Sequence, residues 1–218
     1  MEIVQPYAKL VDVLTLEDGI KLLKKIEWCG RISHRSEDAQ TETSWERFLE
    51  AVVLRHGDWS IVEHVSATVD AVVDRGITHE WVRHRIGAYT QESTRFVNYE
   101  KKMPPKFIMP EGMTPEQEGA WAYGIVQAEA TYKSLLSFGC RPQIARSAFP
   151  NALASRIIVT YNLRNWRHFF LMRTSREAHP QMRQVTIPLL EEFKKRIPIL
   201  YDDITSEATQ ADNMKKMR

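Results

Sequence analysis

Residues 64–74 read HVSATVDAVVD, and this stretch decides the fold class. Apolar side chains alternate with polar ones along most of it, a period of two that is typical of a β-strand with one buried and one hydrated face. A second run, SRIIVTY at residues 155–161, is rich in β-branched side chains and predicts a buried strand. Several helical segments separate the two runs, and strands and helices do not alternate regularly. The sequence therefore predicts an α+β fold, in which a few-stranded, mostly antiparallel sheet packs against several helices.

Helix start and stop signals surround these strands, and residues 15–18 (TLED) and 43–46 (TSWE) each predict a capping box at a helix start. The clearest start signal is TPEQ at residues 114–117, which combines a capping threonine, a proline at the first helical position and a glutamine at the third. Four prolines in residues 103–115 predict a surface loop, and the polar residues beyond 205 are expected to fray. The predicted helices cover residues 15–30, 43–57, 78–85, 114–138, 142–150, 165–175 and 180–196, with a kink expected at Pro188.

Length and composition limit the class of protein. A chain of 218 residues fits one domain, so we expect residues 1–218 to share a single core. Apolar residues make up 43% and charged residues 27%, near the globular average, which excludes disorder as the main state. No long stretch lacks charged side chains, and the first residues do not resemble a secretory signal. With two cysteines outside any CxxC pair, we expect a cytoplasmic protein with no membrane span and no zinc site.

Positive charge is concentrated in one part of the chain. Residues 141–183 contain eight arginines and one acid, a net charge of +7, so the other 175 residues sum to −5. Arginine suits forked recognition of phosphate or carboxylate groups. The concentration therefore predicts an anionic partner, and a solvated basic helix face is the alternative.

The densest polar cluster is RHRIGAYTQESTR at residues 83–95, which we call the signature segment. Its three arginines each offer five N–H donors, Gln91 can donate and accept toward a base edge, and Ser93 can meet a phosphate or carbonyl oxygen. Such a composition predicts a site for a polar, anionic small molecule. An exposed basic turn without a ligand is the alternative.

The arrangement of Arg-His-Arg, seven residues and then Ser resembles the signature of the flavin-dependent thymidylate synthases. Other segments resemble this family in the same order: His56-Gly57, SIVEH at 60–64, Ala145-Arg146, Arg156, residues 162–164 and FFLMR at 169–173. The resemblance implies methylation of dUMP to dTMP, with 5,10-methylenetetrahydrofolate as carbon donor and NADPH-reduced FAD as hydride source. It also implies an α+β subunit of a homotetramer with sites between subunits.

The resemblance further implies which residues bind each ligand. The flavin set comprises Ser60, Arg83, His84, Arg85, Gln91, Asn162, Leu163, Arg164 and His168. The nucleotide set comprises Glu80, Arg83, Gln91, Glu92, Ser93, Thr94, Arg95, Arg146 and Arg173. Glu80 stands where many members have glutamine, so its base-edge contact lacks the amide donors. Asp58 stands where some relatives place histidine.

Positions on the helix predicted near residues 165–175 agree with two ligand sets. Arg164 and His168 lie four residues apart and so share one face. Arg173 lies nine residues from Arg164, about half a turn round the helix, and should face another ligand. A guanidinium beside the pyrimidine would favour the N3 anion and push electron density toward C5. Arg173 is therefore the first catalytic candidate, and Arg95 and Arg146 are expected to anchor the phosphate.

Three other patterns carry weaker predictions. Ser93 is the second catalytic candidate, but no His or Lys lies at a sequence distance that marks an activating base, so a positioning role is favoured. Cys140 follows a predicted helix end beside Arg141, and a structural thiol is favoured there. His79-Glu80 resembles the start of a zinc-binding helix, but Arg83 takes the place of the second histidine, so no metal is expected.

Two other function classes stay open. Arginines interleaved with Trp166, Phe169 and Phe170 would suit a nucleic-acid-binding protein. A modest pI of 8.5 and a net negative remainder argue against a long footprint on a polyanion. The second alternative is a reductase that binds FAD and NADPH without methyl transfer.

Overall fold

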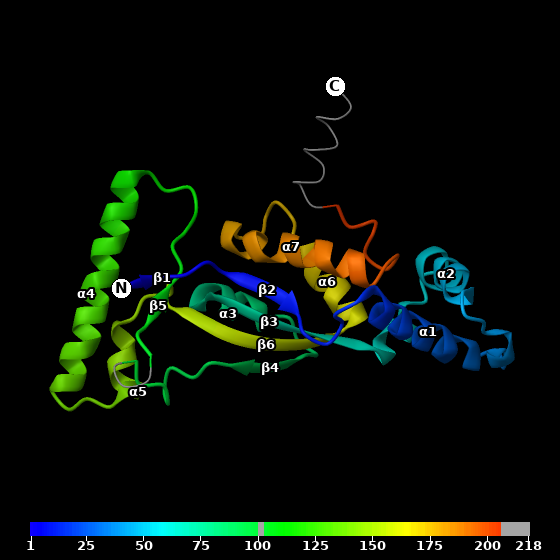
Figure 1. Ribbon diagram of the computed structural model, residues 1–218, viewed down its shortest axis with the longest axis horizontal. Coiled ribbons are helices and arrows are strands. Elements are labelled where there is room, and N and C mark those ends of the chain that lie inside the picture. Colours follow the sequence, from blue (N-terminus) through cyan, green and yellow to red (C-terminus); the bar gives the residue numbers. More distant parts are fainter. Residues whose placement is uncertain (100–102, 206–218) are drawn as a thin grey trace, which may run out of the picture. The chain divides into compact units, whose positions relative to one another are not determined.

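The computed structural model describes residues 1–99 and 103–205, and it confirms the α+β class (Figure 1). A small antiparallel sheet has the strand order β2–β3–β6–β4. Its strands are β2 (Tyr7–Leu10), β3 (Ser66–Asp74), β6 (Ala154–Asn162) and β4 (Ala88–Gln91). Two further strands, β1 (Glu2–Ile3) and β5 (Lys106–Phe107), pair in parallel. The sequence predicted β3 and β6, whereas the short strands carry too few residues for a periodic signal.

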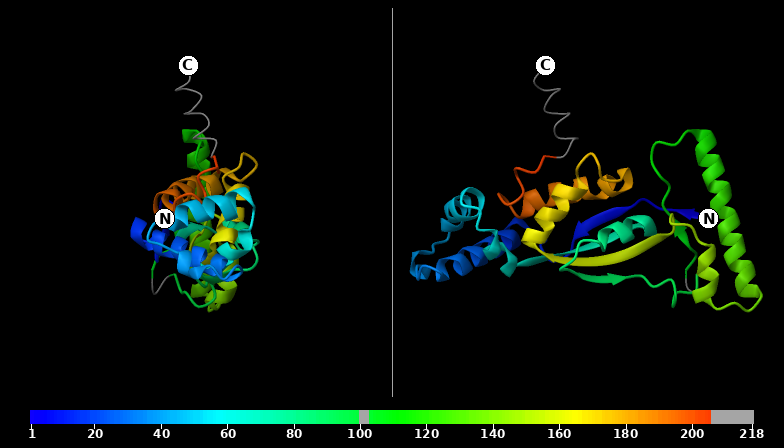
Figure 2. Two further views of the ribbon diagram at one scale, coloured as in Figure 1. Left: turned by 90° about the vertical axis from the view of Figure 1, so that its right-hand side faces the viewer. Right: turned by 180° about the vertical axis from the view of Figure 1, so that it is seen from behind.

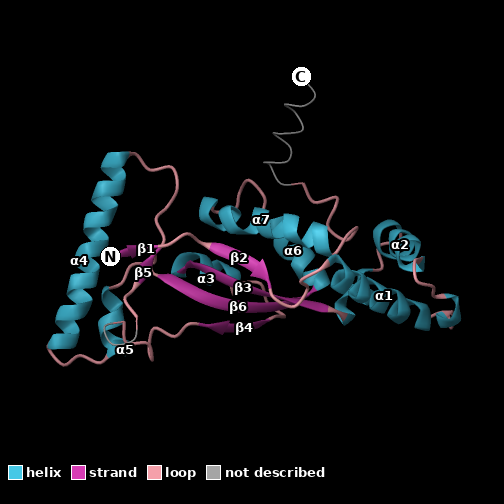
Figure 3. Cartoon of the chain, in the orientation of Figure 1, coloured by secondary structure: helices cyan, strands magenta, loops and turns pink. Residues whose placement is uncertain are grey.

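Helices make up most of the remaining regular structure (Figure 3). The α-helices are α1 (Leu16–Ile32), α2 (Ser44–Leu49), α3 (Arg75–Trp81), α4 (Pro115–Ser137), α5 (Pro142–Ala145), α6 (Leu163–Arg173) and α7 (Pro180–Arg196). The 3₁₀ helices are η1 (Glu37–Ala39), η3 (Trp59–His64) and η4 (Arg146–Ala148), and η2 (Glu50–Arg55) is a π-helix. The predicted fraying falls on residues beyond 205, outside the described residues.

Two of the three predicted capping patterns form. Thr15 accepts a hydrogen bond from the Asp18 N–H and returns one through its own N–H, and Thr114 and Gln117 do the same at α4. The prediction for Thr43 is wrong, because its side chain makes no capping bond at α2. The neighbouring Ser44 hydroxyl bonds Glu27 of α1 at 2.6 Å, so a long-range contact replaces the local one.

Three other structural predictions are also wrong. Helix α3 begins at Arg75 rather than Thr78, because Asp74 accepts a hydrogen bond from the Ile77 N–H at 2.8 Å. Residues 103–115 are not simply a surface loop, since they contain β5 and bury Phe107. The hydrated face expected for β3 is largely absent, and Asp70 is only 3% exposed.

The chain divides into two compact units. Unit 1 comprises residues 1–7, 71–83 and 89–158, and unit 2 comprises residues 8–70, 84–88 and 159 onward. The single-domain organisation expected from the length stays a prediction. None of the helices in residues 1–99 and 103–205 has the length and apolar character needed to cross a bilayer.

The core of unit 1 lies between α4 and the strand β5. Tyr132 of α4 stacks on Phe149 at 4.4 Å between ring centroids, and Tyr99 meets both rings edge-on. Phe107 is fully buried in the same cluster. These aromatic contacts hold the segment that follows the signature segment against α4.

The core of unit 2 is an aromatic cluster between α6 and α7, which lie side by side (Figure 2). Trp166 stacks on Phe170, and Phe193 of α7 contacts both. Buried Tyr201 packs on Phe193 and donates a hydrogen bond to the Leu163 carbonyl at 3.0 Å. The core thus fixes the position of α6, the helix that carries three residues of the predicted flavin set and Arg173 of the nucleotide set.

The last described residues are held by a cation from α6. Arg167 makes a forked ion pair with Asp203, and its guanidinium carbon lies 4.6 Å from the centre of the Trp59 ring. This pairing lowers the pKa of Asp203, chiefly through the hydrogen bonds from Arg167. The segment after α7 is therefore bonded to unit 2 through both buried and surface contacts.

Candidate functional site

His84 and Arg173 meet in unit 2, although 89 residues separate them. The Arg173 Nε–H donates a hydrogen bond to His84 Nε2 at 2.8 Å. The His84 ring also meets Phe169 edge-on at 5.0 Å and His168 at 5.7 Å. One residue of the flavin set thus contacts the first catalytic candidate of the nucleotide set.

The charge state of His84 follows from this contact. Burial, and after it the electrostatic effects of Arg173 and His168, together lower its pKa from 6.5 to about 4. His84 is therefore neutral near pH 7. Because Nε2 accepts from Arg173, the single ring proton lies on Nδ1.

Residues 84–88 form a tight turn in unit 2, which we call the signature turn. Ile86 has a φ of +66°, in the left-handed region that β-branched residues rarely adopt. A Cβ on Gly87 would lie 2.3 Å from two carbons of the Tyr161 ring, so only glycine fits there. Asn165 donates a hydrogen bond to the Ile86 carbonyl at 2.8 Å.

Helix α6 and its cap carry four further residues of the flavin set. Arg164 pairs with Glu63 at 2.5 Å, and His168 is exposed. Asn162 caps the helix by accepting from the Asn165 N–H at 2.8 Å. Leu163 is fully buried with its N–H bonded to Val65, so its predicted flavin contact stays a prediction. Ser60 on η3 and Arg85 in the signature turn are both exposed.

Residues 91–95, which we call the nucleotide segment, lie in unit 1 and are held by polar contacts. The Gln91 amide nitrogen donates to Thr78 at 3.0 Å and to Ser155 at 3.2 Å. The Ser93 hydroxyl accepts from the Arg95 N–H at 3.2 Å. This bond fits the positioning role favoured for Ser93, because the hydroxyl stabilises its own turn.

Arg146 reaches the nucleotide segment from η4. Its Nη1 donates to the hydroxyl of buried Thr94 at 2.7 Å, although 52 residues separate them. The Arg95 side chain is exposed, and its guanidinium lies 5.5 Å from the Phe96 ring centre. Arg83 is exposed after α3, whereas Glu80 is half-buried on that helix. Unit 1 therefore brings together Thr94 and Arg146, both of the nucleotide set.

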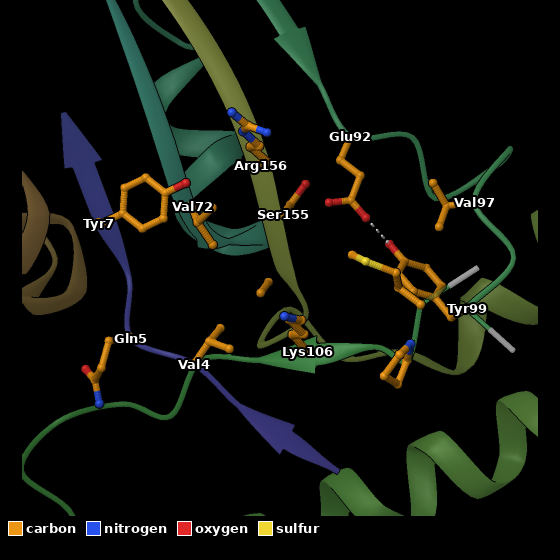
Figure 4. A pocket seen from close by; sticks show the side chains of 13 residues that line it. Val4, Gln5, Tyr7, Val72, Glu92, Val97, Tyr99, Lys106, Ser155 and Arg156 are labelled. Atoms are coloured by element: carbon orange, nitrogen blue, oxygen red, sulfur yellow. Dashed lines mark hydrogen bonds between the residues drawn. The ribbon is translucent and has the colours of Figure 1, made fainter. Parts of the chain in front are cut away.

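A cavity of about 610 Å³ in unit 1 borders the nucleotide segment (Figure 4). Apolar side chains form much of its wall, and Glu92, Lys106 and Arg156 line it as well. Glu92 accepts a hydrogen bond from the Tyr99 hydroxyl at 3.1 Å. Burial, and next the charge of Glu92, raise the pKa of Tyr99 well above its usual value. The Tyr99 phenol is therefore neutral and keeps the proton that it donates to Glu92.

Sequence reasoning missed the residues that support both regions. Thr78 and Ser155 hold Gln91, Tyr99 holds Glu92, and Asn165 holds the signature turn. Only Asn165 had a local signal, because it lies three residues after the helix cap Asn162. Among residues 1–99 and 103–205, no group of three or more His, Cys, Asp or Glu side chains could hold a metal ion.

Comparison with known proteins identifies the family of the chain. The family model described as "Thymidylate synthase complementing protein" matches residues 17–199. The chain is 34% identical over 185 residues to the flavin-dependent thymidylate synthase of Pyrococcus furiosus, covering 80% of this chain and 75% of the relative. It is 32% identical over 220 residues to the enzyme of that name from Mycobacteroides abscessus, covering 93% and 86% of the two chains. The chain therefore belongs to the flavin-dependent thymidylate synthase family of enzymes.

Proposed function

We propose that this protein methylates dUMP to dTMP, with 5,10-methylenetetrahydrofolate as carbon donor and NADPH as the source of reducing equivalents. The observation that carries the proposal is the 2.8 Å hydrogen bond between Arg173 and His84. It joins a nucleotide-set residue to a flavin-set residue within one unit, as a reaction between two adjacent ligands requires. The names of the relatives support the same assignment.

The flavin set fits an anionic dinucleotide such as FAD. Arg85 and His168 present exposed donors, and Arg164 adds a second guanidinium on α6. Forked guanidinium donors suit the pyrophosphate and the polar ring edge of FAD. When bound, FAD would supply the redox chemistry that connects NADPH oxidation with reduction at the nucleotide. The chain's own residues hold and orient the cofactor beside Arg173.

The nucleotide set supplies anchoring and activation. Arg146, fixed by Thr94, and the exposed Arg95 are suited to the dUMP phosphate. His84 is a neutral acceptor, so this hydrogen bond does not neutralise the Arg173 guanidinium. A guanidinium held beside the pyrimidine favours the N3 anion and thereby raises electron density at C5, where the new carbon is added.

Self-association as a homotetramer, with sites shared between subunits, is part of the proposal. Large apolar side chains are exposed on α4 and at its end, including Tyr123 at 69% and Phe138 at 83%. On α6, Leu171 and Met172 are about half exposed next to Arg173. Exposed apolar side chains of this size are typical of surfaces that contact other chains. The cytoplasmic location expected from the sequence stays a prediction.

The direct test is dTMP formation from dUMP, methylenetetrahydrofolate and NADPH, with FAD omitted in a parallel reaction. We expect product only when flavin is present, and a change in the flavin absorption spectrum when dUMP is added. A flavin spectrum with NADPH oxidation but no dTMP would leave only the reductase function. A colourless protein whose DNA binding falls steeply with salt would instead support the nucleic-acid-binding alternative.

A further inference from the structure

Ile86 adopts a backbone conformation that its own side chain does not favour. Its φ of +66° places a β-branched residue in the left-handed region, where Cβ crowds the backbone. The side chain is 83% exposed, so burial within this chain does not offset the strain. Strained residues of this kind persist where surrounding contacts determine the conformation, and they cluster at functional sites.

Two contacts in unit 2 determine the conformation of Ile86. The first is steric, because Gly87 lies so close to Tyr161 that even a Cβ would overlap the ring. Tyr161 cannot retreat, since it is buried and its ring lies 4.6 Å from Trp166. The second contact is the hydrogen bond from the Asn165 amide to the Ile86 carbonyl, at 2.8 Å.

Asn165 is itself fixed at the start of α6. Its backbone N–H donates to the side chain of Asn162 at 2.8 Å. The Ile86 carbonyl can only accept a hydrogen bond, so the nitrogen of the Asn165 amide must face it. The helix cap and the signature turn are thus linked through one side chain.

The signature turn is fixed at its other end as well. His84 packs on Phe169 and accepts from Arg173. Arg85 lies between His84 and Ile86, whose positions are both fixed. The backbone of Arg85 is therefore held in place, and this sets the direction in which its exposed side chain points. Loss of the hydrogen bond to the Ile86 carbonyl would free one end of the turn. It would not remove any residue of the predicted ligand sets.

We propose that Asn165 is a positioning residue, which holds the strained Ile86 peptide so that His84 and Arg85 are presented to the flavin. The inference rests on the proposed function for its ligand. Neither the flavin set nor the nucleotide set contains Asn165 or Ile86.

The test measures FAD affinity of the full chain by fluorescence titration. Asn165→Ala removes the donor and should weaken FAD binding about fivefold, the usual effect of one neutral hydrogen bond. Ile86→Asn places a residue that tolerates the left-handed region at the strained position, so it should bind FAD at least as well as the original chain. In the Ile86→Asn background, Asn165→Ala should cost less than about twofold, because the turn then needs less support.

Gln40→Ala is the matched control. The Gln40 amide also donates to a backbone carbonyl at 2.8 Å, that of Lys24, but far along the chain from the signature turn. It should leave FAD affinity unchanged. Asn165→Asp is a second variant that removes the donor while placing an acid in the first turn of α6, where acids stabilise helices. It should fold as well as the original chain and bind FAD at least as weakly as Asn165→Ala.

A second readout needs no flavin. Hydrogen exchange of the peptide covering residues 84–91 should be faster in Asn165→Ala than in the original chain and should slow again when Ile86→Asn is added. Unchanged FAD affinity in Asn165→Ala, or a fivefold loss that persists in the Ile86→Asn background, would overturn the positioning role. Failure of the original chain to bind FAD would instead refute the proposed function, and the exchange experiment would still report on the turn.

Discussion

The signature turn and the nucleotide segment are separated by only two residues, yet different forces hold them. In the turn, Gly87 packs closely against the buried Tyr161 ring, and Asn165 of α6 donates a hydrogen bond to the strained Ile86 peptide. In the nucleotide segment, hydroxyl, amide and guanidinium groups bond one another in unit 1. The turn should therefore be sensitive to added volume, and the nucleotide segment to the loss of a single polar partner.

The largest effect is expected at Arg173, which contacts the signature turn. Arg173→Ala should lower the turnover number for dTMP formation about a hundredfold while FAD still binds, because a charge that acts in the transition state is lost. Arg164→Ala should weaken FAD binding instead. The measurement is steady-state kinetics together with a flavin titration.

Arg55→Ala provides the control for loss of an arginine, since Arg55 is paired on the surface of η2 with Glu50. Arg55→Ala should change neither the turnover number nor the affinity for FAD. Equal loss of flavin in Arg173→Ala and Arg164→Ala would contradict the separation of the two roles.

Added volume at Gly87 should unfold the signature turn. Gly87→Ala places a methyl group about where the Tyr161 ring lies, and we expect a loss of about 3 kcal/mol in the free energy of unfolding. Urea unfolding measures this directly. Gly124→Ala on α4 is the control, because nothing lies within 4 Å of its added Cβ. That variant should instead gain about 0.5–1 kcal/mol from helix propensity; equal effects would show that the tight packing is unimportant.

Loss of one polar partner should affect the nucleotide segment more mildly. Thr94→Val removes the acceptor that fixes Arg146, and the KM for dUMP should rise about tenfold with little change in kcat. The control is Thr131→Val, which removes a hydroxyl that bonds the Gln127 carbonyl of its own helix α4. If the KM stays the same in Thr94→Val, Arg146 does not need this partner to hold the substrate.

The last expected effect is a pH dependence due to His84, which is confined to pH values below about 6.5. Its pKa is about 4 in the folded protein and 6.5 for an ordinary histidine, so the unfolded chain binds more protons between these values. The free energy of unfolding should therefore fall as the pH falls from 6.5 to 4. His84→Asn keeps an acceptor for Arg173 but does not titrate. Urea unfolding at several pH values should show a weaker decline for this variant, and parallel curves would argue against the lowered pKa.

Local signals predicted much of the secondary structure. The caps at Thr15 and Thr114 form as expected because both partners lie within three residues. Thr43 fails because Ser44 bonds Glu27, a residue of another helix. The strand β2 was not predicted, because four residues are too few for a periodic signal. It forms by pairing with β3.

The candidate site was also predicted only in part, because local patterns were visible in the sequence and long-range contacts were not. Residue types and spacing identified the signature segment and the two faces of α6. They could not show that His84 meets Arg173, because the two residues are 89 positions apart in the sequence. The strain at Ile86 was equally invisible, since isoleucine favours extended structure and only Tyr161 and Asn165 impose another conformation.

The anchoring of the segment after α7 sets a practical limit on shortening the chain. Tyr201 is buried against the aromatic core, and Asp203 holds Arg167 over Trp59. A stop codon placed before position 201 would leave a hole beside Phe193 and an uncompensated cation on α6. Serial truncation should therefore show an abrupt loss of soluble yield at that position, where the useful boundary for expression lies.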